Sequence, residues 1–359
     1  MDRKILQTIV VPLLIICIFL SCKKDKPNTP VNELPKDNTS KVLIVCEGSL
    51  GNGNAELSLY NYKSDSVFND IYKTANKQSL GDVFHGIYKK NDRYFLCVNN
   101  SDKIVVLDNK TWLQRASITI SKPRNILAIT DHKAYVGSLF SNKIYVLNTT
   151  TLAVEKEIAM PYQNVEGMLL KDGIAFICCW DTACNKLYKI NTGTDQISDS
   201  ITLGGRAPQS IVLDKENKLW VLGGNAYKNK ASNLNRIDIG TKKVLFEQSF
   251  EKGVEAIKMC TNANRDSLYF LEVNYAGGST NNGVFRMNIN AVNLPSTPFV
   301  SCLANQYFWA LGIEPKSGNI YVGDPKGFVQ KSSVYIYSPQ GKLNKQFNVG
   351  LGVGAFYFD

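Results

Sequence analysis

The chain has 359 residues, a formal net charge of +10 and only two histidines. A basic balance can indicate a nucleic-acid partner, but the lysines are scattered and no basic run lies beside an aromatic platform, so we expect no nucleic-acid binding. With two histidines, a multi-histidine metal site is excluded.

The first residues have the features of an export signal. Arg3 and Lys4 give a positive start, and an apolar run follows over residues 9–20. A membrane span needs about twenty apolar residues, and this run is shorter. The serine before Cys22 resembles the end of a bacterial lipobox, so we expect a signal peptide over 1–21 and lipidation of Cys22. A plain secreted protein and an uncleaved N-terminal anchor are the alternatives.

Residues 22–40 are rich in Lys, Asp, Asn, Pro and Thr and contain almost no apolar side chains. Such a composition cannot bury enough apolar surface to fold, and we expect a flexible tether. The remainder, 41–359, is large for one ordinary domain, but repeat architectures such as propellers reach this size as a single unit.

The cysteines do not form an obvious disulfide framework. Of the nine, Cys17 leaves with the signal and Cys22 takes the lipid, which leaves an odd number that cannot all pair. Most of the others, such as Cys46, lie in apolar strand-like runs, where a thiol packs as a small hydrophobe. Cys178 and Cys179 are adjacent, but neighbouring strand residues point to opposite faces. We therefore expect buried free thiols.

A repeated pair of strands runs through the folded part of the chain. Its template is Tyr135-Val136 followed by the alternating run 143–147, and it recurs at intervals of roughly 40 to 50 residues, the length of a four-stranded propeller blade. The first strand of each pair begins near Val42, Tyr94, Ala134, Ala175, Leu219, Leu268 and Ile320. Its partner begins near Glu56, Lys103, Lys143, Lys186, Asn233, Gly283 and Ser333.

A third strand precedes each copy. These strands are predicted over 83–88, 124–129, 165–170, 209–213, 254–259, 308–313 and 353–358. The last has no outer strands after it, and the opening segment from Val42 has no inner strand before it. We therefore predict an all-β, seven-bladed β-propeller whose C-terminal strand closes the ring against the N-terminal strands, which removes open sheet edges. No segment of ten residues has a helical period, which argues against an α/β fold.

The loops indicate where a site would lie. With strands a to d counted outward from the axis, the b-to-c loops and d-to-a connections share one rim, here called the long-loop rim; the a-to-b and c-to-d turns form the short-turn rim. The b-to-c loops cover 47–54, 99–102, 138–142, 180–185, 223–232, 273–282 and 324–331. Long, non-repetitive loops on a rigid scaffold are where binding residues usually lie.

The long-loop rim gathers aromatic and polar side chains, the mixture typical of a ligand site. The candidate ligand-binding residues are Asn99, Asn100, Arg124, Phe140, Trp180, Asp181, Asn225, Tyr227, Asn274, Tyr275 and Asp324. Glu166, Gln209, Phe308, Trp309 and Phe328 lie on the same rim. For Phe308 and Trp309 especially, packing between blades is the alternative role.

Signatures of catalysis are few. His132 lies in a turn of the short-turn rim, and His85 opens an inner strand, where we expect a structural role. The glycine-rich run 48–53 joins two strands and has no following helix, so it lacks dinucleotide-binding geometry. We expect no enzyme activity, no cofactor and no metal. A calcium-dependent lactonase site is the alternative, and its candidate carboxylates are Glu47, Glu166, Glu255 and Asp324.

Several segments carry a family resemblance. They are 47–55, 80–83, 98–101, 123–126, 218–222, 294–296, 307–312, 319–324 and 354–356. With them the chain resembles the YncE-like propeller lipoproteins of Bacteroidetes, and specifically the branch related to surface-exposed propellers that bind vitamin B12 (cobalamin). These segments are largely structural, so the site residues above depend on the rim geometry.

The resemblance implies a lid and capture device on a TonB-dependent outer-membrane transporter, holding cobalamin or a related corrinoid on one propeller face. It also implies a lipid-anchored protein of the outer membrane that faces the cell surface and touches the membrane through its anchor only. A non-catalytic adhesion or protein-interaction propeller is the alternative function, and an enzyme is the third.

Overall fold

The computed structural model describes residues 34–35, 40–274, 282–303 and 306–359. Every strand described below lies within one compact unit, Val31–Asp359. The expected signal peptide, Cys22 and nearly all of the expected tether lie outside the described residues. No helix among the described residues is long and apolar enough to cross a membrane.

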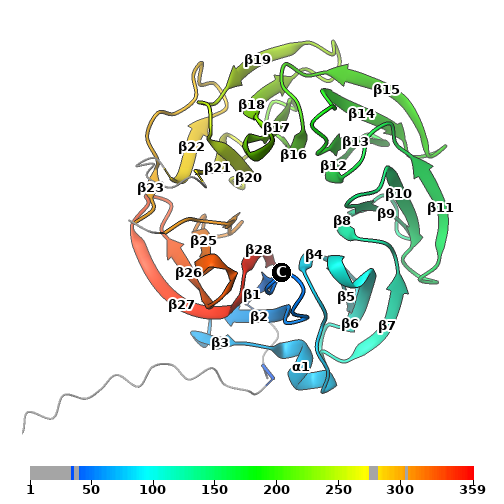
Figure 1. Ribbon diagram of the computed structural model, residues 1–359, viewed down its shortest axis with the longest axis vertical. Coiled ribbons are helices and arrows are strands. Elements are labelled where there is room, and N and C mark those ends of the chain that lie inside the picture. The colour runs from blue at the N-terminus through cyan, green and yellow to red at the C-terminus, as the bar shows by residue number, and fades with distance from the viewer. Residues whose placement is uncertain (1–33, 36–39, 275–281, 304–305) are drawn as a thin grey trace, which may run out of the picture. The chain divides into compact units, whose positions relative to one another are not determined.

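The described residues form seven antiparallel sheets of four strands each, arranged in a ring with the inner strands around the centre (Figure 1). The inner strands a are β28 (Val353–Phe358), β4 (Phe84–Lys90), β8 (Pro123–Ala128), β12 (Val165–Lys171), β16 (Pro208–Leu213), β20 (Glu255–Thr261) and β24 (Ala310–Ile313). Strands b are β1 (Lys41–Cys46), β5 (Arg93–Val98), β9 (Lys133–Ser138), β13 (Ile174–Cys179), β17 (Leu219–Asn225), β21 (Ser267–Val273) and β25 (Ile320–Asp324). The predicted seven-bladed propeller is confirmed.

The outer half of each blade completes the sheet. Strands c are β2 (Glu56–Asn61), β6 (Lys103–Asp108), β10 (Lys143–Asn148), β14 (Lys186–Asn191), β18 (Lys230–Ile237), β22 (Gly283–Asn288) and β26 (Lys331–Tyr337). Strands d are β3 (Ser66–Phe68), β7 (Gln114–Thr119), β11 (Val154–Ala159), β15 (Gln196–Thr202), β19 (Val244–Ser249), β23 (Val300–Ser301) and β27 (Leu343–Leu351). The helices are short: α1 (Ile71–Asn76), η1 (Asn99–Ser101), η2 (Ala226–Lys228) and η3 (Lys326–Phe328).

The strand bounds differ from prediction mainly in two places. β18 begins at Lys230, before the predicted Asn233, because pairing of Asn225 with Lys230 extends the ladder into the loop. β24 begins at Ala310, after the predicted 308.

The ring closes as predicted. β28 pairs with β1 in antiparallel register from Val42 opposite Phe358 to Cys46 opposite Val353. Blade 1 therefore has the strand order β28-β1-β2-β3, with its inner strand supplied by the C-terminus. Blades 2 to 7 follow in chain order, from β4–β7 to β24–β27.

The core lies between blades, because each sheet is covered on both faces by its neighbours. Cys178 packs in a cluster with Leu219 of blade 5, whereas Cys179 packs in a cluster with Tyr135 of blade 3. The two thiols thus point to opposite faces of β13, and all seven cysteines of the described residues are free. The prediction of free thiols is confirmed, although Cys260 and Cys302 are only partly buried.

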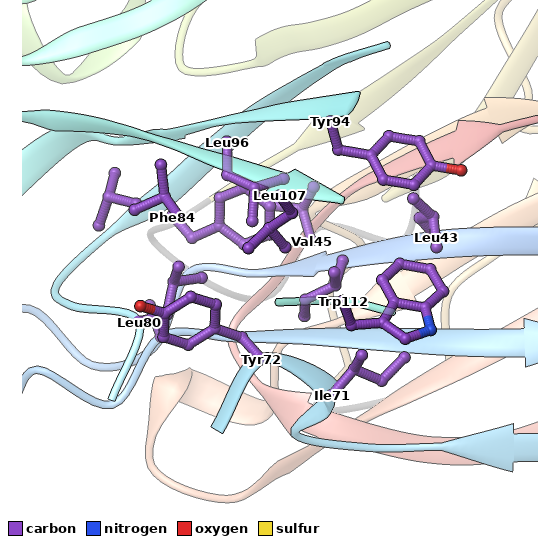
Figure 2. Packing of buried hydrophobic residues seen from close by; sticks show 14 of the residues in the cluster. Leu43, Val45, Ile71, Tyr72, Leu80, Phe84, Tyr94, Leu96, Leu107 and Trp112 are labelled. Atoms are coloured by element: carbon purple, nitrogen blue, oxygen red, sulfur yellow. The ribbon is translucent and has the colours of Figure 1, made fainter. Parts of the chain in front are cut away.

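A helix seals the gap between blades 1 and 2. Ile71 and Tyr72 of α1 are buried with Leu43 of β1, Tyr94 of β5 and Trp112 (Figure 2). Burial of large aromatic side chains at this joint stabilises the junction where the two ends of the chain meet.

Candidate functional site: a cavity at the long-loop rim

A cavity of about 900 Å³ opens at the long-loop rim. Its walls are inner-strand residues, and its mouth is formed by the b-to-c loops. The structure brings together the predicted residues Arg124, Phe140, Trp180, Asp181, Asn225 and Tyr227 around it.

One position at the start of each inner strand, or just before it in blade 7, forms the inner wall. Side chains alternate between the two faces of a strand. A proline or apolar residue that packs between blades stands at or just before the start of each inner strand, so the next residue faces the centre of the ring. At this position the blades carry His85, Arg124, Glu166, Gln209, Glu255, Trp309 and Gly354. All but Gly354 line the cavity.

A buried ion pair dominates one side of this wall. Arg124 donates from Nε to Oε2 of Glu166 over 2.8 Å and from Nη2 to Oε1 over 2.9 Å. Such a two-bond arrangement fixes both side chains. Burial opposes the charge of Glu166, but the Arg124 guanidinium outweighs it and the pKa of Glu166 is lowered. The carboxylate is therefore ionised at neutral pH.

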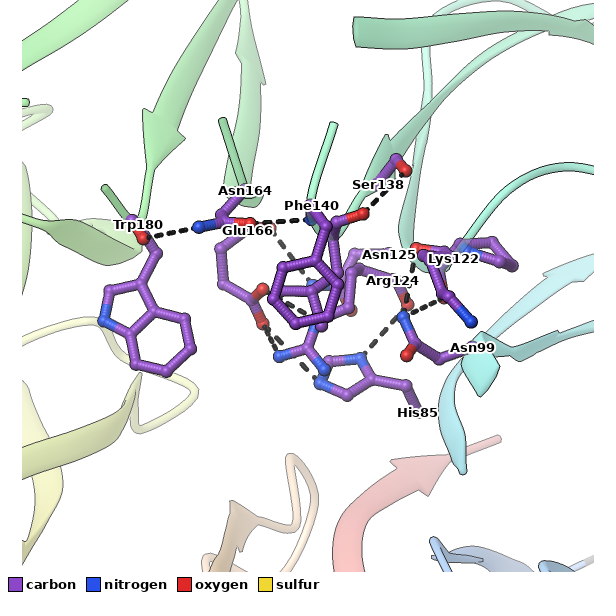
Figure 3. Close-up of polar contacts among 12 residues, drawn as sticks. His85, Asn99, Lys122, Arg124, Asn125, Ser138, Phe140, Asn164, Glu166 and Trp180 are labelled. Carbon is purple, nitrogen blue, oxygen red and sulfur yellow. Dashed lines mark hydrogen bonds and ion pairs between the residues drawn. The ribbon is translucent and has the colours of Figure 1, made fainter. Parts of the chain in front are cut away.

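His85 completes the network (Figure 3). Its Nδ1 lies 3.2 Å from the backbone carbonyl oxygen of Arg124, and because a carbonyl only accepts, Nδ1 carries the proton. Its Nε2 lies 3.6 Å from Oε1 of Glu166. Burial, followed by the positive charge of Arg124, lowers the pKa of His85 to about 3. The imidazole is therefore neutral at physiological pH.

Exposed aromatic side chains edge the mouth. Phe140 is 72% exposed and Tyr227 is 90% exposed. Phe140 has a left-handed backbone with φ of 56°, a strained conformation for a bulky residue. Oδ1 of Asn164 accepts a hydrogen bond from the backbone N–H of Phe140 at 2.7 Å, and Nδ2 of Asn164 donates to the carbonyl oxygen of Trp180 at 3.2 Å. Asn164 thus holds the loops of blades 3 and 4 together (Figure 3).

Two further contacts position the loop of blade 5. Oδ1 of Asn225 accepts from the backbone N–H of Lys228 at 3.0 Å and caps η2, the turn that carries Tyr227. Oε2 of Glu255 accepts from the backbone N–H of Ala226 at 2.5 Å. A capped turn holds the Tyr227 backbone while its ring stays in solvent.

Four of the remaining predicted residues do not line the cavity: Asn99, Asn100, Asn274 and Asp324. Asn99 is buried and donates from Nδ2 to the carbonyl of Lys122 at 3.0 Å. Asn100 donates to Oδ2 of Asp82 at 2.5 Å and accepts from the Lys122 ammonium at 2.9 Å. Both asparagines therefore fix the loop of blade 2 against its neighbours.

Loops of blades 6 and 7 use their polar residues in a similar way. Asp324 is buried, and its Oδ1 accepts from the backbone N–H of Lys326 at 2.9 Å. The backbone N–H of Asn274 donates to Oδ1 of Asn282 at 2.9 Å. Tyr275 lies outside the described residues.

Phe308 and Trp309, for which packing between blades was the alternative role, lie in different environments. Phe308 is buried in the core between blades 6 and 7. Trp309 lines the cavity and donates from Nε1 to Oε1 of Glu47 at 3.0 Å. The Glu47 carboxylate occupies space that Gly354 leaves open, since a Cβ on Gly354 would lie 2.2 Å from Oε1. Glu47, which follows β1, thus supplies the wall side chain that Gly354 of the closing strand β28 lacks.

Lys258 is a cavity residue that the sequence pattern missed. It has a left-handed backbone with φ of 58°, and the register of β20 against β21 shifts between Ile257 and Cys260. The irregularity breaks the two-residue period from which inward-facing residues are predicted, so no signal in the sequence placed Lys258 in the channel.

The carboxylates of the cavity do not converge. Glu166, Glu47 and Glu255 each accept from a different protein donor, and Asp324 is not in the cavity lining. Among the described residues no group of three or more His, Cys, Asp or Glu side chains is placed to hold a metal ion. The arrangement of a polar floor, apolar walls and an aromatic mouth is suited to binding.

These features define a seven-bladed β-propeller with a cavity at one end of its channel. The domain of unknown function DUF5074 matches residues 41–358. The chain therefore belongs to the DUF5074 family. No curated protein sequence matches the chain significantly.

Solved structures with a similar fold are distant in sequence. A quinonprotein alcohol dehydrogenase-like protein from Bacteroides thetaiotaomicron is 14% identical, with a TM-score of 0.66 over 89% of this chain and 78% of that one. Hydrazine synthase of Kuenenia stuttgartiensis is 15% identical, with a TM-score of 0.60 over 76% of this chain and 88% of that one. Dihydro-heme d1 dehydrogenase is 10% identical, with a TM-score of 0.61 over 92% and 77%. At these identities the similarities show the fold alone.

Proposed function

We propose that the protein is a non-catalytic capture module that binds cobalamin or a related corrinoid in the cavity of the long-loop rim and passes it to a TonB-dependent outer-membrane transporter. The observation that carries the proposal is the convergence of the aromatic loops of blades 3, 4 and 5 on one cavity of about 900 Å³. The resemblance of the scaffold segments to vitamin B12-binding propellers supports the choice of ligand.

The chemistry of the lining matches that of a corrinoid, which is a large ligand with apolar ring faces and amide groups at its edges. The apolar lining comprises Ile126, Leu127, Leu139, Met168, Ile211, Ile257, Met259 and Leu311. The amide lining comprises Asn125, Gln163, Asn164, Gln209 and Asn225. Apolar walls provide affinity and a few convergent polar groups fix orientation.

Titration calorimetry with cyanocobalamin tests the proposal. We expect binding without turnover, and we expect Tyr227→Ala or Phe140→Ala to weaken it by roughly 2 kcal/mol if the ring is a hot spot. Both rings are exposed, so their removal leaves the core intact. His132→Ala, in the short-turn rim, is the control and should leave affinity unchanged. Absence of heat and of retained corrinoid at micromolar protein would refute the proposal.

The same rim favours a second candidate, docking of a protein partner. Leu50, Leu303 and Val329 are exposed on it. Leu50 and Val329 also line a smaller hollow of about 390 Å³ beside Phe328. Exposed apolar side chains gathered on one face are typical of interaction surfaces. Failure of corrinoid binding would leave this protein-interaction function as the better one.

A further inference from the structure

Lys258 is a cation of the cavity wall that contacts an aromatic ring and forms no ion pair with the described residues. Lys258 lies on the inner strand β20 and lines the cavity, with its Nζ 5.8 Å from the centre of the Trp309 ring. The described residues give this ammonium no salt bridge and no hydrogen bond. Burial lowers the pKa of Lys258. Lys258 is only half-buried, but partial burial of an ammonium without a hydrogen bond still costs free energy, so an anion that reaches it would gain a strong interaction.

The carboxylates around Lys258 are already bound. Glu166 accepts two bonds from Arg124, and Glu47 accepts from Trp309 Nε1. Arg124 uses Nε and Nη2 for Glu166, and its Nη1 has no partner in the described part of the chain. The floor of the cavity therefore offers two kinds of free donor, the Lys258 ammonium and Nη1 of Arg124.

We propose that Lys258, assisted by Arg124, binds a singly charged anionic group of the ligand, a phosphodiester or a carboxylate, at the floor of the cavity. Glu47 and Glu166 act on the charge of Lys258 from the same floor. Their negative charge opposes a doubly charged group such as a phosphate monoester, because like charges raise the cost of binding. The class is therefore a monoanion.

This inference rests on the proposed function where it concerns corrinoids. Cobalamin carries a phosphodiester in its nucleotide loop, and cobinamide is the corrinoid without that loop. We expect the wild-type protein to bind cyanocobalamin about tenfold to hundredfold more tightly than dicyanocobinamide, the range of a hydrogen bond to a charged group. Lys258→Met keeps an unbranched side chain of nearly the same length without the charge and should remove this preference.

The matched control is Lys252→Met, which removes one charge from an exposed residue of the same rim, outside the cavity lining. It should keep the preference for cyanocobalamin, and so should Lys258→Arg, which keeps the charge. Equal affinity of the wild type for both corrinoids, or an unchanged preference in Lys258→Met, would overturn the anion site while leaving corrinoid capture in place.

Bromide separates the anion site from corrinoid capture. Crystals of the wild-type protein soaked in sodium bromide should give an anomalous peak beside Nζ of Lys258, absent from Lys258→Met. If neither corrinoid binds but this peak is present, corrinoid capture fails and the monoanion site stands. If the peak is absent from the wild type and neither corrinoid binds, both fail. The presence or absence of the peak in the wild-type map decides whether the anion site exists, so the test does not depend on correct folding of the variant.

Discussion

The phenolic oxygen of Tyr94 lies 2.6 Å from Oδ2 of Asp359, so the last residue of the chain is bound to strand β5 of blade 2. Lys89 also binds the Asp359 carboxylate, and the Lys41 ammonium lies 3.4 Å from its Oδ2. Burial raises the pKa of Asp359, but the bonds from Lys89 and Tyr94 outweigh it and the pKa is lowered. The hydrogen bond and ion pairs of Asp359 therefore stabilise ring closure in addition to the pairing of β28 with β1.

Removal of the Tyr94 hydroxyl should weaken the attachment of Asp359 to blade 2. We expect Tyr94→Phe to lower the free energy of unfolding by about 1 kcal/mol, the usual value of one hydrogen bond, as measured by urea denaturation. Tyr188→Phe is the control, because the Tyr188 ring is buried but its hydroxyl forms no hydrogen bond with the described residues. Equal effects of the two substitutions would show that the bond to Asp359 adds nothing.

Deletion of residues 352–359 should prevent stable folding. The deletion removes β28, the inner strand of blade 1, and exposes the edge of β1, whose six residues are all buried. Loss of a cooperative thermal transition, followed by circular dichroism, is the expected result. A truncated protein that melts like the full chain would contradict the closure by β28.

His85 should make stability depend on pH. Its pKa falls from 6.5 to about 3 on folding, so the unfolded chain binds a proton that the folded protein does not. The contribution is fully present above pH 6.5 and is lost as the pH falls toward 3, by about 1 kcal/mol for each pH unit. Urea denaturation at pH 7 and pH 4.5 should show a smaller acid loss for His85→Gln than for the wild type. Equal losses would mean that His85 titrates normally.

Asn164 should couple the two aromatic loops of blades 3 and 4. Asn164→Asp keeps the acceptor for the Phe140 N–H but loses the donor to the Trp180 carbonyl, whereas Asn164→Ala loses both. We expect the free energy of unfolding to fall in the order wild type, Asp, Ala, by about 1 kcal/mol at each step. Thermal melts, with cyanocobalamin affinity as the second readout, test the order. Affinity that is unaffected in both variants would show that the loops need no coupling.

Lipidation of Cys22 is tested by fractionation. The wild type should enter the membrane fraction and incorporate labelled palmitate, and Cys22→Ser should do neither. Cys302→Ser, which changes a cysteine of the propeller, should behave as the wild type. Soluble, unlabelled wild-type protein would refute the anchor.

The blades could be predicted because their signal is repeated: an alternating strand pair such as 133–138 with 143–148 recurs, and each copy fixes the register of the next. Loop residues carry no such signal. Asn99 and Asp324 look like ligand-binding residues of the rim in the sequence, yet both are hydrogen-bonded to backbone groups of loops. The role of such a side chain is set by neighbours from other segments.

Lys258 and Asn164 show the converse. Lys258 reaches the cavity through a local irregularity of β20, which periodicity cannot reveal. Asn164 lies before β12 with φ of 62°, and its importance comes from contacts to Phe140 and Trp180 of two different loops. Both residues depend on three-dimensional neighbours, whereas Phe140, Trp180 and Tyr227 could be found because large aromatics in long loops are rarely needed for turns.

The contact of Glu47 with Trp309 beside Gly354 has a consequence for the order of events during synthesis. Glu47 leaves the ribosome early, but the wall against which its carboxylate packs exists only after residue 354 has followed. The Glu47 side of the cavity floor is therefore complete only after the final strand has been made. A chain that lacks the final strand should therefore lack the wall that Glu47 and Ala355 contribute to the cavity.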